Sequence, residues 1–183
     1  EVADMVLLGG CLANTFLKAR GINIGRSLVN SEALQKAKKI WEKASLKKRY
    51  LFLPVDVIVG DLTKNYCQGT VEIDKVGLES EILDIGPKTG KYYQSLIYQA
   101  KTIIWNGPMG VVEKKPFAGG TRAVYEAVVA NKKAVSLVGG GDTLAAITQK
   151  SISPYIYLST GGGAMLEFIE KGTLPGIKVL LNK

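Results

Sequence analysis

The stretch Ser136–Ile147, SLVGGGDTLAAI, sets three consecutive glycines between an apolar, strand-like run and a helix-like pattern. Two further stretches have the same form, Leu7–Phe16 (LLGGCLANTF) and Leu158–Phe168 (LSTGGGAMLEF). In open α/β sheets, ligands bind at the carboxyl ends of the strands. Glycine lets a ligand approach the backbone closely, and the N-terminus of the following helix attracts anions. Three such junctions at one edge favour an anion-binding site; the alternative is that the glycines serve only tight turns and close packing.

Strand-like and helix-like segments alternate along the chain. Apolar runs predict strands at residues 4–10, 50–60, 102–107, 133–141 and 155–163. Apolar residues at helical spacing predict helices at residues 11–21, 31–45, 87–100, 120–131, 142–150 and 164–172, the last helix. The mixed-charge segment 61–77 is expected to form a loop. This alternation predicts an α/β fold: one three-layer αβα, Rossmann-like domain over residues 1–183, with a mostly parallel sheet.

The composition is that of a globular chain with a core, since 46% of the 183 residues are hydrophobic. No apolar run approaches the ~20 residues of a membrane-spanning helix, so no membrane partner is expected. The first residues, EVADMVLLGG, carry acids and no basic region, which argues against a signal peptide. Cys11 and Cys67 fit a reduced, cytoplasmic protein. Because the chain starts without Met and enters a strand-like run at once, we expect a piece of a longer polypeptide.

The net charge of +8 is compatible with several anionic partners, from nucleic acid to a small phosphorylated molecule. The densest basic segment is Lys36–Arg49, KAKKIWEKASLKKR, with apolar residues on one helical face and lysines on the other. This pattern favours a solvated amphipathic helix over a nucleic-acid-binding surface, since aromatic residues are sparse and no RNA- or DNA-binding signature is present. The chain has no histidine, which excludes histidine acid–base catalysis and histidine metal ligands within it.

Asp142 and Thr143 directly follow the central glycine run. A phosphate repels a neighbouring carboxylate unless a cation lies between them, and Mg²⁺ binds one or two carboxylates together with phosphate oxygens. Thr143 can donate its hydroxyl to a phosphate. The alternative is that both residues only cap the helix. Neither the Walker loop nor the dinucleotide pattern G-x-G-x-x-G matches, so the residues alone predict a phosphate-binding α/β domain without identifying its ligand.

The segment Ile103–Thr121, IIWNGPMGVVEKKPFAGGT, ends a strand in a turn rich in glycine and proline. We expect Trp105 in the core. Asn106 can contact a phosphate, and Glu113 can accept hydrogen bonds from ribose hydroxyls. The alternative is a purely structural loop, which the spacing alone does not exclude.

Several motifs, taken together, resemble the C-terminal, nucleotide-binding domain of phosphoglycerate kinase. They are TFLKARGINIGRSL, LPVDVIV, DIGPKT, WNGPMGVVE, GGGDT and STGGGAMLEFIEKGTLPG, in the family's order along nearly the whole chain. The resemblance implies reversible phosphoryl transfer between 1,3-bisphosphoglycerate and Mg-ADP, giving 3-phosphoglycerate and Mg-ATP in glycolysis. It implies ATP or ADP and Mg²⁺ as cofactors, and a cytoplasmic monomer with no nucleic acid as partner.

The resemblance also implies roles for individual residues. The nucleotide phosphates would be bound by Lys18, Asn106 and Thr143. Gly140 and Gly141 would approach the nucleotide, and Asp142 would hold Mg²⁺. The phosphoryl group in transfer would be faced by Lys18, by Gly141 and by the N–H groups around Thr160, Gly161 and Gly162. The adenine site would be lined by Leu53 and Leu83, and the ribose would be bound by Glu113.

Two positions depart from the family's pattern near its adenine pocket. Cys11 stands where the family usually has a third glycine, and Ile82 where it usually has glycine before LDIGP. We expect these side chains to narrow the pocket or change base preference; Val112, in place of the usual Phe, is a milder change. The family's N-terminal domain, which binds phosphoglycerate, is not in this chain. We therefore expect ADP and ATP binding with negligible turnover, and the alternative is a nucleotide-binding module that has no catalysis of its own.

Overall fold

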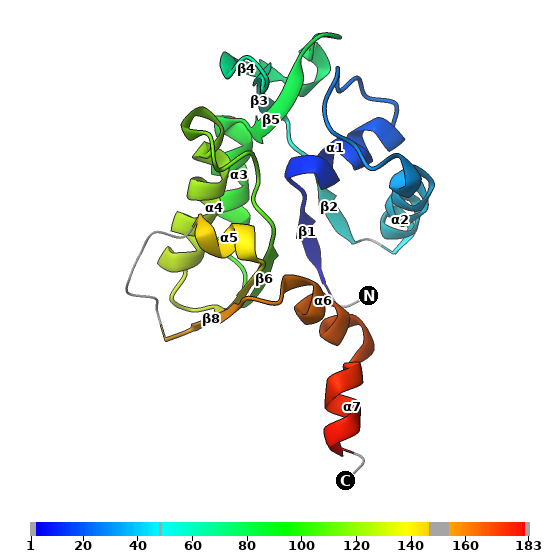
Figure 1. The fold of residues 1–183 in the computed structure, drawn as a ribbon, viewed down its shortest axis with the longest axis vertical. Helices are drawn as coiled ribbons and strands as arrows, with labels where there is room; N and C mark the ends of the chain where they lie inside the picture. The colour runs from blue at the N-terminus through cyan, green and yellow to red at the C-terminus, as the bar shows by residue number, and fades with distance from the viewer. Residues whose placement is uncertain (1–2, 48, 147–153, 182–183) are drawn as a thin grey trace.

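The computed structural model describes residues 3–47, 49–146 and 154–181 (Figure 1). The first half contains β1 (Met5–Leu7), α1 (Gly10–Ala19), α2 (Leu34–Leu46), β2 (Tyr50–Phe52), β3 (Asp56–Asp61), β4 (Tyr66–Glu72) and β5 (Glu81–Ile85). The second half contains α3 (Pro87–Ile97), β6 (Thr102–Asn106), α4 (Gly119–Ala130), β7 (Val135–Gly139), α5 (Gly141–Ala145), β8 (Ile156–Ser159), α6 (Gly162–Lys171) and α7 (Pro175–Leu181). Short 3₁₀ helices lie between them: η1 (Ser31–Ala33), η2 (Ile73–Lys75) and η3 (Lys115–Phe117).

The described strands form three sheets. β1 pairs in parallel with β2, and β6, β7 and β8 form a parallel sheet with β7 in the middle. β3 pairs antiparallel with β4 on one side and with β5 on the other. Three of these five pairings are parallel, which confirms the predicted α/β class with mostly parallel strands and flanking helices. The pairings do not, however, join the described strands into one continuous sheet.

Two predictions in the first half are wrong. The expected strand at 50–60 is two strands, β2 and β3, which belong to different sheets. Pro54 lies between them and has no N–H to offer a neighbouring strand, so it separates the two pairings. The expected loop at 61–77 contains β4, an edge strand whose residues alternate between exposed and half-buried positions. Because the exposed face of this edge strand carries polar residues, its sequence lacks the continuous apolar run by which the other strands were predicted.

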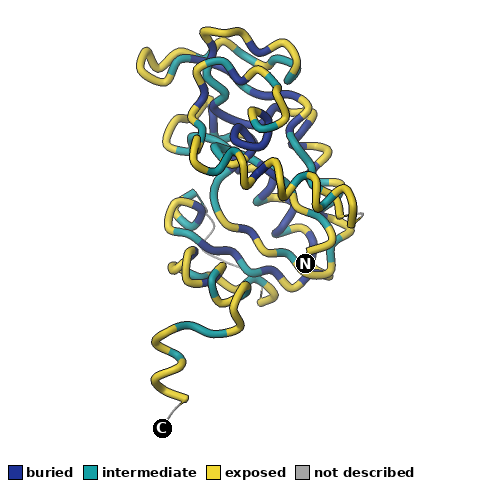
Figure 2. Tube along the Cα trace, turned by 90° about the vertical axis from the view of Figure 1, so that its right-hand side faces the viewer, coloured by how far each residue is buried: buried dark blue, intermediate teal, exposed yellow. Residues whose placement is uncertain are grey.

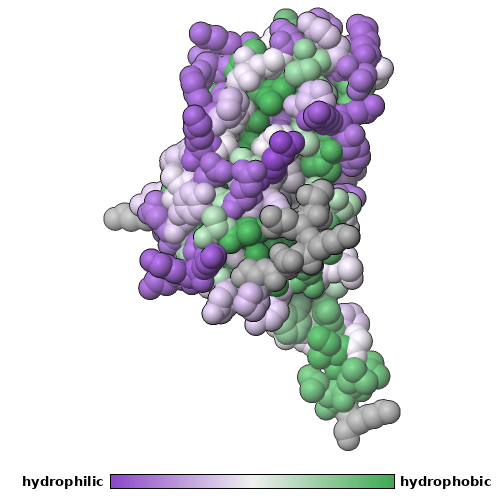
Figure 3. All heavy atoms as spheres, turned by 90° about the vertical axis from the view of Figure 1, so that its left-hand side faces the viewer, coloured by the Kyte–Doolittle hydropathy of each residue, from purple (hydrophilic) through white to green (hydrophobic). Residues whose placement is uncertain are grey.

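The C-terminal helices also differ in part from expectation. α6 ends at Gly172, which has φ of 69°, as its sequence predicts. It is not the last helix, because α7 follows and Pro175 begins it, a position that proline favours. The helix predicted at 142–150 begins as α5, and residues 147–150 lie outside the described residues. α7 extends away from the rest of the chain and is largely exposed, with apolar side chains along it (Figures 2 and 3). Within the described ranges, none of the helices has the length and apolar character to cross a membrane.

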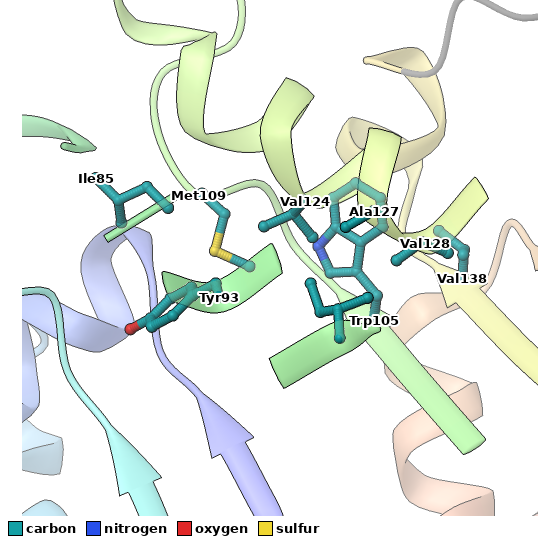
Figure 4. Close-up of a cluster of buried hydrophobic side chains, with 9 residues drawn as sticks. Ile85, Tyr93, Trp105, Met109, Val124, Ala127, Val128 and Val138 are labelled. Carbon is teal, nitrogen blue, oxygen red and sulfur yellow. The ribbon is translucent and has the colours of Figure 1, made fainter. Parts of the chain in front are cut away.

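The largest core cluster joins the β6–β7–β8 sheet to α3 and α4 (Figure 4). Trp105 of β6 is 4% exposed and lies among side chains of α4, which confirms its predicted place in the core. A second cluster packs α1 against α2, and a third lies within the antiparallel sheet. Tyr93 of α3 connects the first cluster to the β1–β2 pair, because its hydroxyl donates to the carbonyl oxygens of Leu8 and Phe52. The shared core thus holds the parallel strands together across separate sheets.

Candidate functional site

Three strands of the parallel sheet end side by side. Asn106, the last residue of β6, pairs in register with Gly139 of β7, and Gly139 pairs with Ser159 of β8. Helices α5 and α6 begin at Gly141 and Gly162, directly beyond the ends of β7 and β8. The register therefore confirms that the junctions at Leu137–Ile147 and Leu158–Phe168 meet at one edge of the sheet. The prediction of three junctions at one sheet edge is wrong for Leu7–Phe16, because β1 pairs with β2 in a different sheet.

The first glycine junction packs against the loop that follows β6. Gly10 begins α1, and its N–H donates to the carbonyl oxygen of Met109 over 3.0 Å. Gly10 has φ of 56°, and a Cβ on Gly9 would overlap the Met109 sulfur. These glycines thus serve a left-handed turn and a close approach between two chain segments. At this junction the packing alternative accounts for both glycines.

Asn106, Gly140 and Gly162 are closely packed. A Cβ on Gly162 would lie 2.6 Å from Asn106 Oδ1 and 2.8 Å from the backbone nitrogen of Gly140. A Cβ on Gly140 would lie 2.7 Å from the same Oδ1, and Gly140 has φ of 98°, a conformation that favours glycine. Asn106 is nevertheless exposed. The two glycines therefore let the accessible side-chain amide of Asn106 lie against the end of β7 and the start of α6.

Thr143 stabilises the turn that follows β6. Its side chain is fully buried, and its Oγ1 accepts the N–H of Gly107 over 2.8 Å. The indole N–H of Trp105 donates to the carbonyl oxygen of Gly107, also over 2.8 Å. Thr143 thus links the start of α5 to the end of β6. Its predicted donation to a phosphate stays a prediction; the bond from Gly107 uses a lone pair of Oγ1 and not its proton.

Other glycines of the same edge face open space. A Cβ on Gly141 or on Gly163 would meet no atom within 4 Å. Thr160 and Gly161 are exposed just before α6, whose first N–H groups have no carbonyl partner within the helix. The glycine runs therefore contain two kinds of position: some are required by packing, and others leave backbone free to approach an anion.

Asp142 is the acidic residue of this edge. It is exposed in the first turn of α5, beside Gly141. Within the described part of the chain, no three Cys, Asp or Glu side chains gather into a metal-binding cluster. One carboxylate is sufficient for Mg²⁺ when phosphate oxygens and water complete its coordination shell. The donor set therefore fits Mg²⁺ that arrives with a nucleotide.

The residues expected around adenine and ribose come from separate elements. Leu53 follows β2 and is half-buried against the α1–α2 cluster. Leu83 of β5 is 7% exposed, and a Cβ added to Gly60 would lie 3.3 Å from one of its methyl carbons. Glu113 is exposed between β6 and α4. No hydrogen bond among the described residues joins these three, unlike the residues at the strand ends.

Lys18 lies in the last turn of α1 and is exposed. It is eight residues beyond Gly10, so the helical rise places it about 12 Å along the axis from the start of the helix. α1 therefore carries Lys18 away from the glycine junction that precedes it. Its phosphate-binding role stays a prediction that rests on the resemblance.

Two buried carboxylates received no role from the sequence. Asp56 is 1% exposed and accepts the N–H groups of Lys88 and Thr89, at the start of α3, over 3.0 and 2.7 Å. Asp84 is 2% exposed and accepts the N–H of Gly120, at the start of α4, over 2.7 Å. The available signal was an acid inside an otherwise apolar strand run, because a buried carboxylate requires donors.

Comparisons with known proteins were made by sequence and by structure. The sequence model of the phosphoglycerate kinase family matches residues 1–172. A phosphoglycerate kinase of Coxiella burnetii is 49% identical over 185 residues, covering 100% of this chain and 47% of that protein. A phosphoglycerate kinase of Desulfosudis oleivorans is 45% identical, covering 98% of this chain and 46% of that protein.

Solved structures give the same result. The structure of phosphoglycerate kinase from Coxiella burnetii matches with a TM-score of 0.89 at 47% identity, covering 99% of this chain and 47% of that one. The enzyme from Pyrococcus horikoshii matches with a TM-score of 0.80 at 34% identity, covering 98% and 45%. The chain thus spans about half the length of the relatives that it matches.

Proposed function

The chain belongs to the phosphoglycerate kinase family, and on this premise we propose that it is the C-terminal, nucleotide-binding domain of such a kinase. The proposed reaction of the whole enzyme is reversible phosphoryl transfer between 1,3-bisphosphoglycerate and Mg-ADP, giving 3-phosphoglycerate and Mg-ATP. One observation carries the nucleotide assignment: Asn106, Gly139 and Ser159 end their strands in one register row, next to the exposed Gly141 and Asp142.

The proposed site has two ends. We call Asn106, Gly140, Gly141, Asp142 and Gly162 the phosphate end, and Leu53, Leu83 and Glu113 the adenosine end. At the phosphate end, the exposed amide of Asn106 and the backbone N–H groups at the start of α5 and α6 would hold phosphate oxygens. At the adenosine end, the two leucines would contact the base and Glu113 would accept the ribose hydroxyls. Lys18 joins this assignment only through the resemblance.

The chemistry asks little of the protein beyond positioning and charge neutralisation. The N–H groups around Thr160, Gly161 and Gly162 would orient the phosphoryl group and stabilise its charge during transfer. Asp142 would hold Mg²⁺, which when bound neutralises phosphate charge. The acyl-phosphate oxygen can leave without a general acid, so a chain that lacks histidine is compatible with this half of the reaction.

The carboxylate substrate would be bound by a part of the enzyme outside this chain. Phosphoryl transfer requires donor and acceptor to be held in line, which a nucleotide-binding domain alone does not achieve. We therefore expect the isolated chain to bind ADP and ATP with negligible turnover, as a monomer in the cytoplasm. Phosphoglycerate-dependent ADP formation from ATP by the purified chain would contradict this expectation.

Calorimetric titration with ADP and ATP, with and without Mg²⁺, tests the assignment. Saturable binding that Mg²⁺ strengthens is expected, and Asp142→Asn should remove most of the Mg²⁺-dependent gain. Asp74→Asn is the matched control, since Asp74 is also exposed but lies in η2, away from the strand ends. Absence of saturable binding, or an equal Mg²⁺ effect in both variants, would overturn the proposed role of the phosphate end.

A further inference from the structure

The loop at residues 107–118, here the linking loop, connects β6 to α4 and carries Glu113. It is anchored at its start to Thr143, through Gly107. Two residues on, the Met109 N–H donates to Thr121 Oγ1 over 2.9 Å in a buried bond. Both anchors lie on elements that follow the loop in the chain. Beyond Met109, the contacts of the loop change to a different element, β5.

Asp84 of β5 provides the next contact of the loop. Gly110 packs directly against the Asp84 side chain, since a Cβ on Gly110 would overlap its carboxyl group. Oδ2 of the same carboxyl accepts the N–H of Gly120, and its Oδ1 accepts the N–H of Ile85 over 2.8 Å. A Cβ on Gly120 would also overlap this carboxyl group. The carboxyl therefore fills a space bounded by the loop and by the first turn of α4.

The residue before Asp84 continues the connection. The carbonyl oxygen of Leu83 accepts the N–H of Val111 over 2.9 Å. Glu113 follows two residues later, and Leu83 is itself a residue of the adenosine end. One short segment, Leu83–Asp84, thus contacts Gly110, Val111 and the start of α4 at once. The position of the exposed Glu113 relative to Leu83 depends on these contacts.

Among the described residues, Asp84 has backbone donors and no charged partner. Burial raises the pKa of its carboxyl to about 7, and the N–H groups of Gly120, Ile85 and Gly119 act in the opposite direction. No charged side chain among the described residues contributes to this shift. The carboxyl is therefore held in place by hydrogen bonds and packing, and a substitution there changes local geometry without breaking an ion pair.

We propose that Asp84 is a positioning residue for the adenosine end, acting through Gly110 and the start of α4 to set where the linking loop presents Glu113. The proposal rests on the proposed function for its nucleotide readout. Asp84 has no described contact with Asn106, Gly140 or Gly162, so the phosphate end should not depend on it.

Asp56 is a matched control within the same chain. It too is buried and accepts N–H groups at a helix start, those of α3. A Cβ on Gly86 would overlap the Asp56 carboxyl, just as a Cβ on Gly110 would overlap that of Asp84. The difference is that Asp56 contacts no residue of the linking loop in the described structure. Asp56→Asn therefore reports the general cost of weakening a buried helix start.

Hydrogen exchange without nucleotide tests the positioning itself. The hydrogen-bonded amides of Val111, Lys114 and Phe117 should exchange about tenfold faster in Asp84→Asn, because the substitution weakens the bond from Gly120 and alters the packing beside Gly110. In Asp56→Asn the faster exchange should be confined to the start of α3. Gly110→Ala retains Asp84 but pushes the loop off its carboxyl, so it tests the same contact if Asp84→Asn does not fold. Unchanged exchange of the loop in both Asp84→Asn and Gly110→Ala would overturn the proposal.

Two ligands then separate the ends of the site. ADP should bind about fivefold to tenfold more weakly to Asp84→Asn and Gly110→Ala, whereas Mg-pyrophosphate, which lacks adenosine, should bind within twofold of wild type. An equal loss for both ligands, or an equal loss of ADP affinity in Asp56→Asn, would mean that Asp84 is merely structural. Failure of the wild-type chain to bind either ligand would overturn the proposed function and the adenosine role together, while hydrogen exchange still decides whether Asp84 positions the loop.

Discussion

At the phosphate end, neighbouring strands stop in one register row, whereas the adenosine end takes its three residues from three separate segments. Asn106, Gly139 and Ser159 are fixed beside one another by strand pairing. In the described part of the chain, Leu83 and Glu113 are connected through the contacts of Asp84 and of the linking loop. A site built on sheet register needs little tertiary support, and a site built on a loop requires an anchor.

The two ends also differ in the packing that each one requires. At the phosphate end the critical requirement is the absence of side chains, because Gly140 and Gly162 lie against Asn106. At the adenosine end it is the presence of one, the Asp84 carboxyl, which fills the space beside Gly110. Substitutions at the phosphate end should therefore act through added volume, whereas at the adenosine end removal of the Asp84 carboxyl should act as well as added volume at Gly110.

The largest expected effect is a pH dependence that comes from Asp84. Its raised pKa, about 7 against the ordinary 3.8 of an aspartate, means that the folded chain retains a proton that the unfolded chain releases near pH 4. The contribution of Asp84 to the free energy of unfolding is therefore fully present below about pH 4. It falls as the pH rises to 7 and does not change further above pH 7. At about 1.4 kcal/mol per pKa unit, its loss between pH 5 and pH 8 is on the order of 3 kcal/mol.

Urea unfolding of wild type and Asp84→Asn across this pH range measures this loss of stability. The difference between the two free energies of unfolding should shift in favour of the variant as the pH rises. Asp56→Asn provides the comparison at the other buried carboxylate. Parallel curves for wild type and Asp84→Asn would show that the carboxyl does not titrate in this range.

Next in size is the cost of a methyl group at the phosphate end. Gly162→Ala places a Cβ against backbone atoms of Gly140 and against Asn106 Oδ1, so unfolding should become easier by about 2 kcal/mol. Gly163→Ala, one residue later in the same helix, meets open space and should be neutral or stabilising by up to about 1 kcal/mol. Chemical denaturation of the pair tests the packing, and equal stabilities would show that the close contacts relax freely.

A smaller effect is expected from Cys11, the side chain that replaces a glycine of the family's pattern. If it narrows the adenine pocket, Cys11→Gly should tighten ADP binding severalfold and leave Mg-pyrophosphate binding unchanged. The matching test at Ile82 is less clean, because this side chain packs against the cluster of Val57, Val59 and Val76. Calorimetry with both ligands measures the change, and identical ADP affinities would reject the narrowing.

The smallest effect is expected from Lys18. Lys18 is exposed in the last turn of α1, and no contact of its amine with the phosphate end is described. On this geometry Lys18→Met should weaken ADP binding less than twofold, like Lys36→Met on α2. A tenfold loss confined to Lys18→Met, and reduced by added salt, would instead place Lys18 among the phosphate ligands as the resemblance implies.

Much of the fold followed from local pattern. Helix and strand periods are set by neighbouring residues, so α3, α4, β6 and β7 were predicted close to their observed bounds. β4 was missed because an edge strand exposes one polar face and loses the apolar signal. α7 was missed because Pro175 was interpreted as a stop after α6, although proline also begins helices.

The sequence by itself determined the α/β class and predicted three glycine junctions at one sheet edge, of which two meet there, since glycine runs and apolar periods are local properties. Only the tertiary structure decided which glycines serve packing and which face open space, and that Asp84 anchors the linking loop. These depend on residues distant in the chain: Gly110 and Gly120 lie 26 and 36 positions beyond Asp84 and touch it only after folding. No local pattern encodes such a contact, because its free energy belongs to the pair and not to either segment.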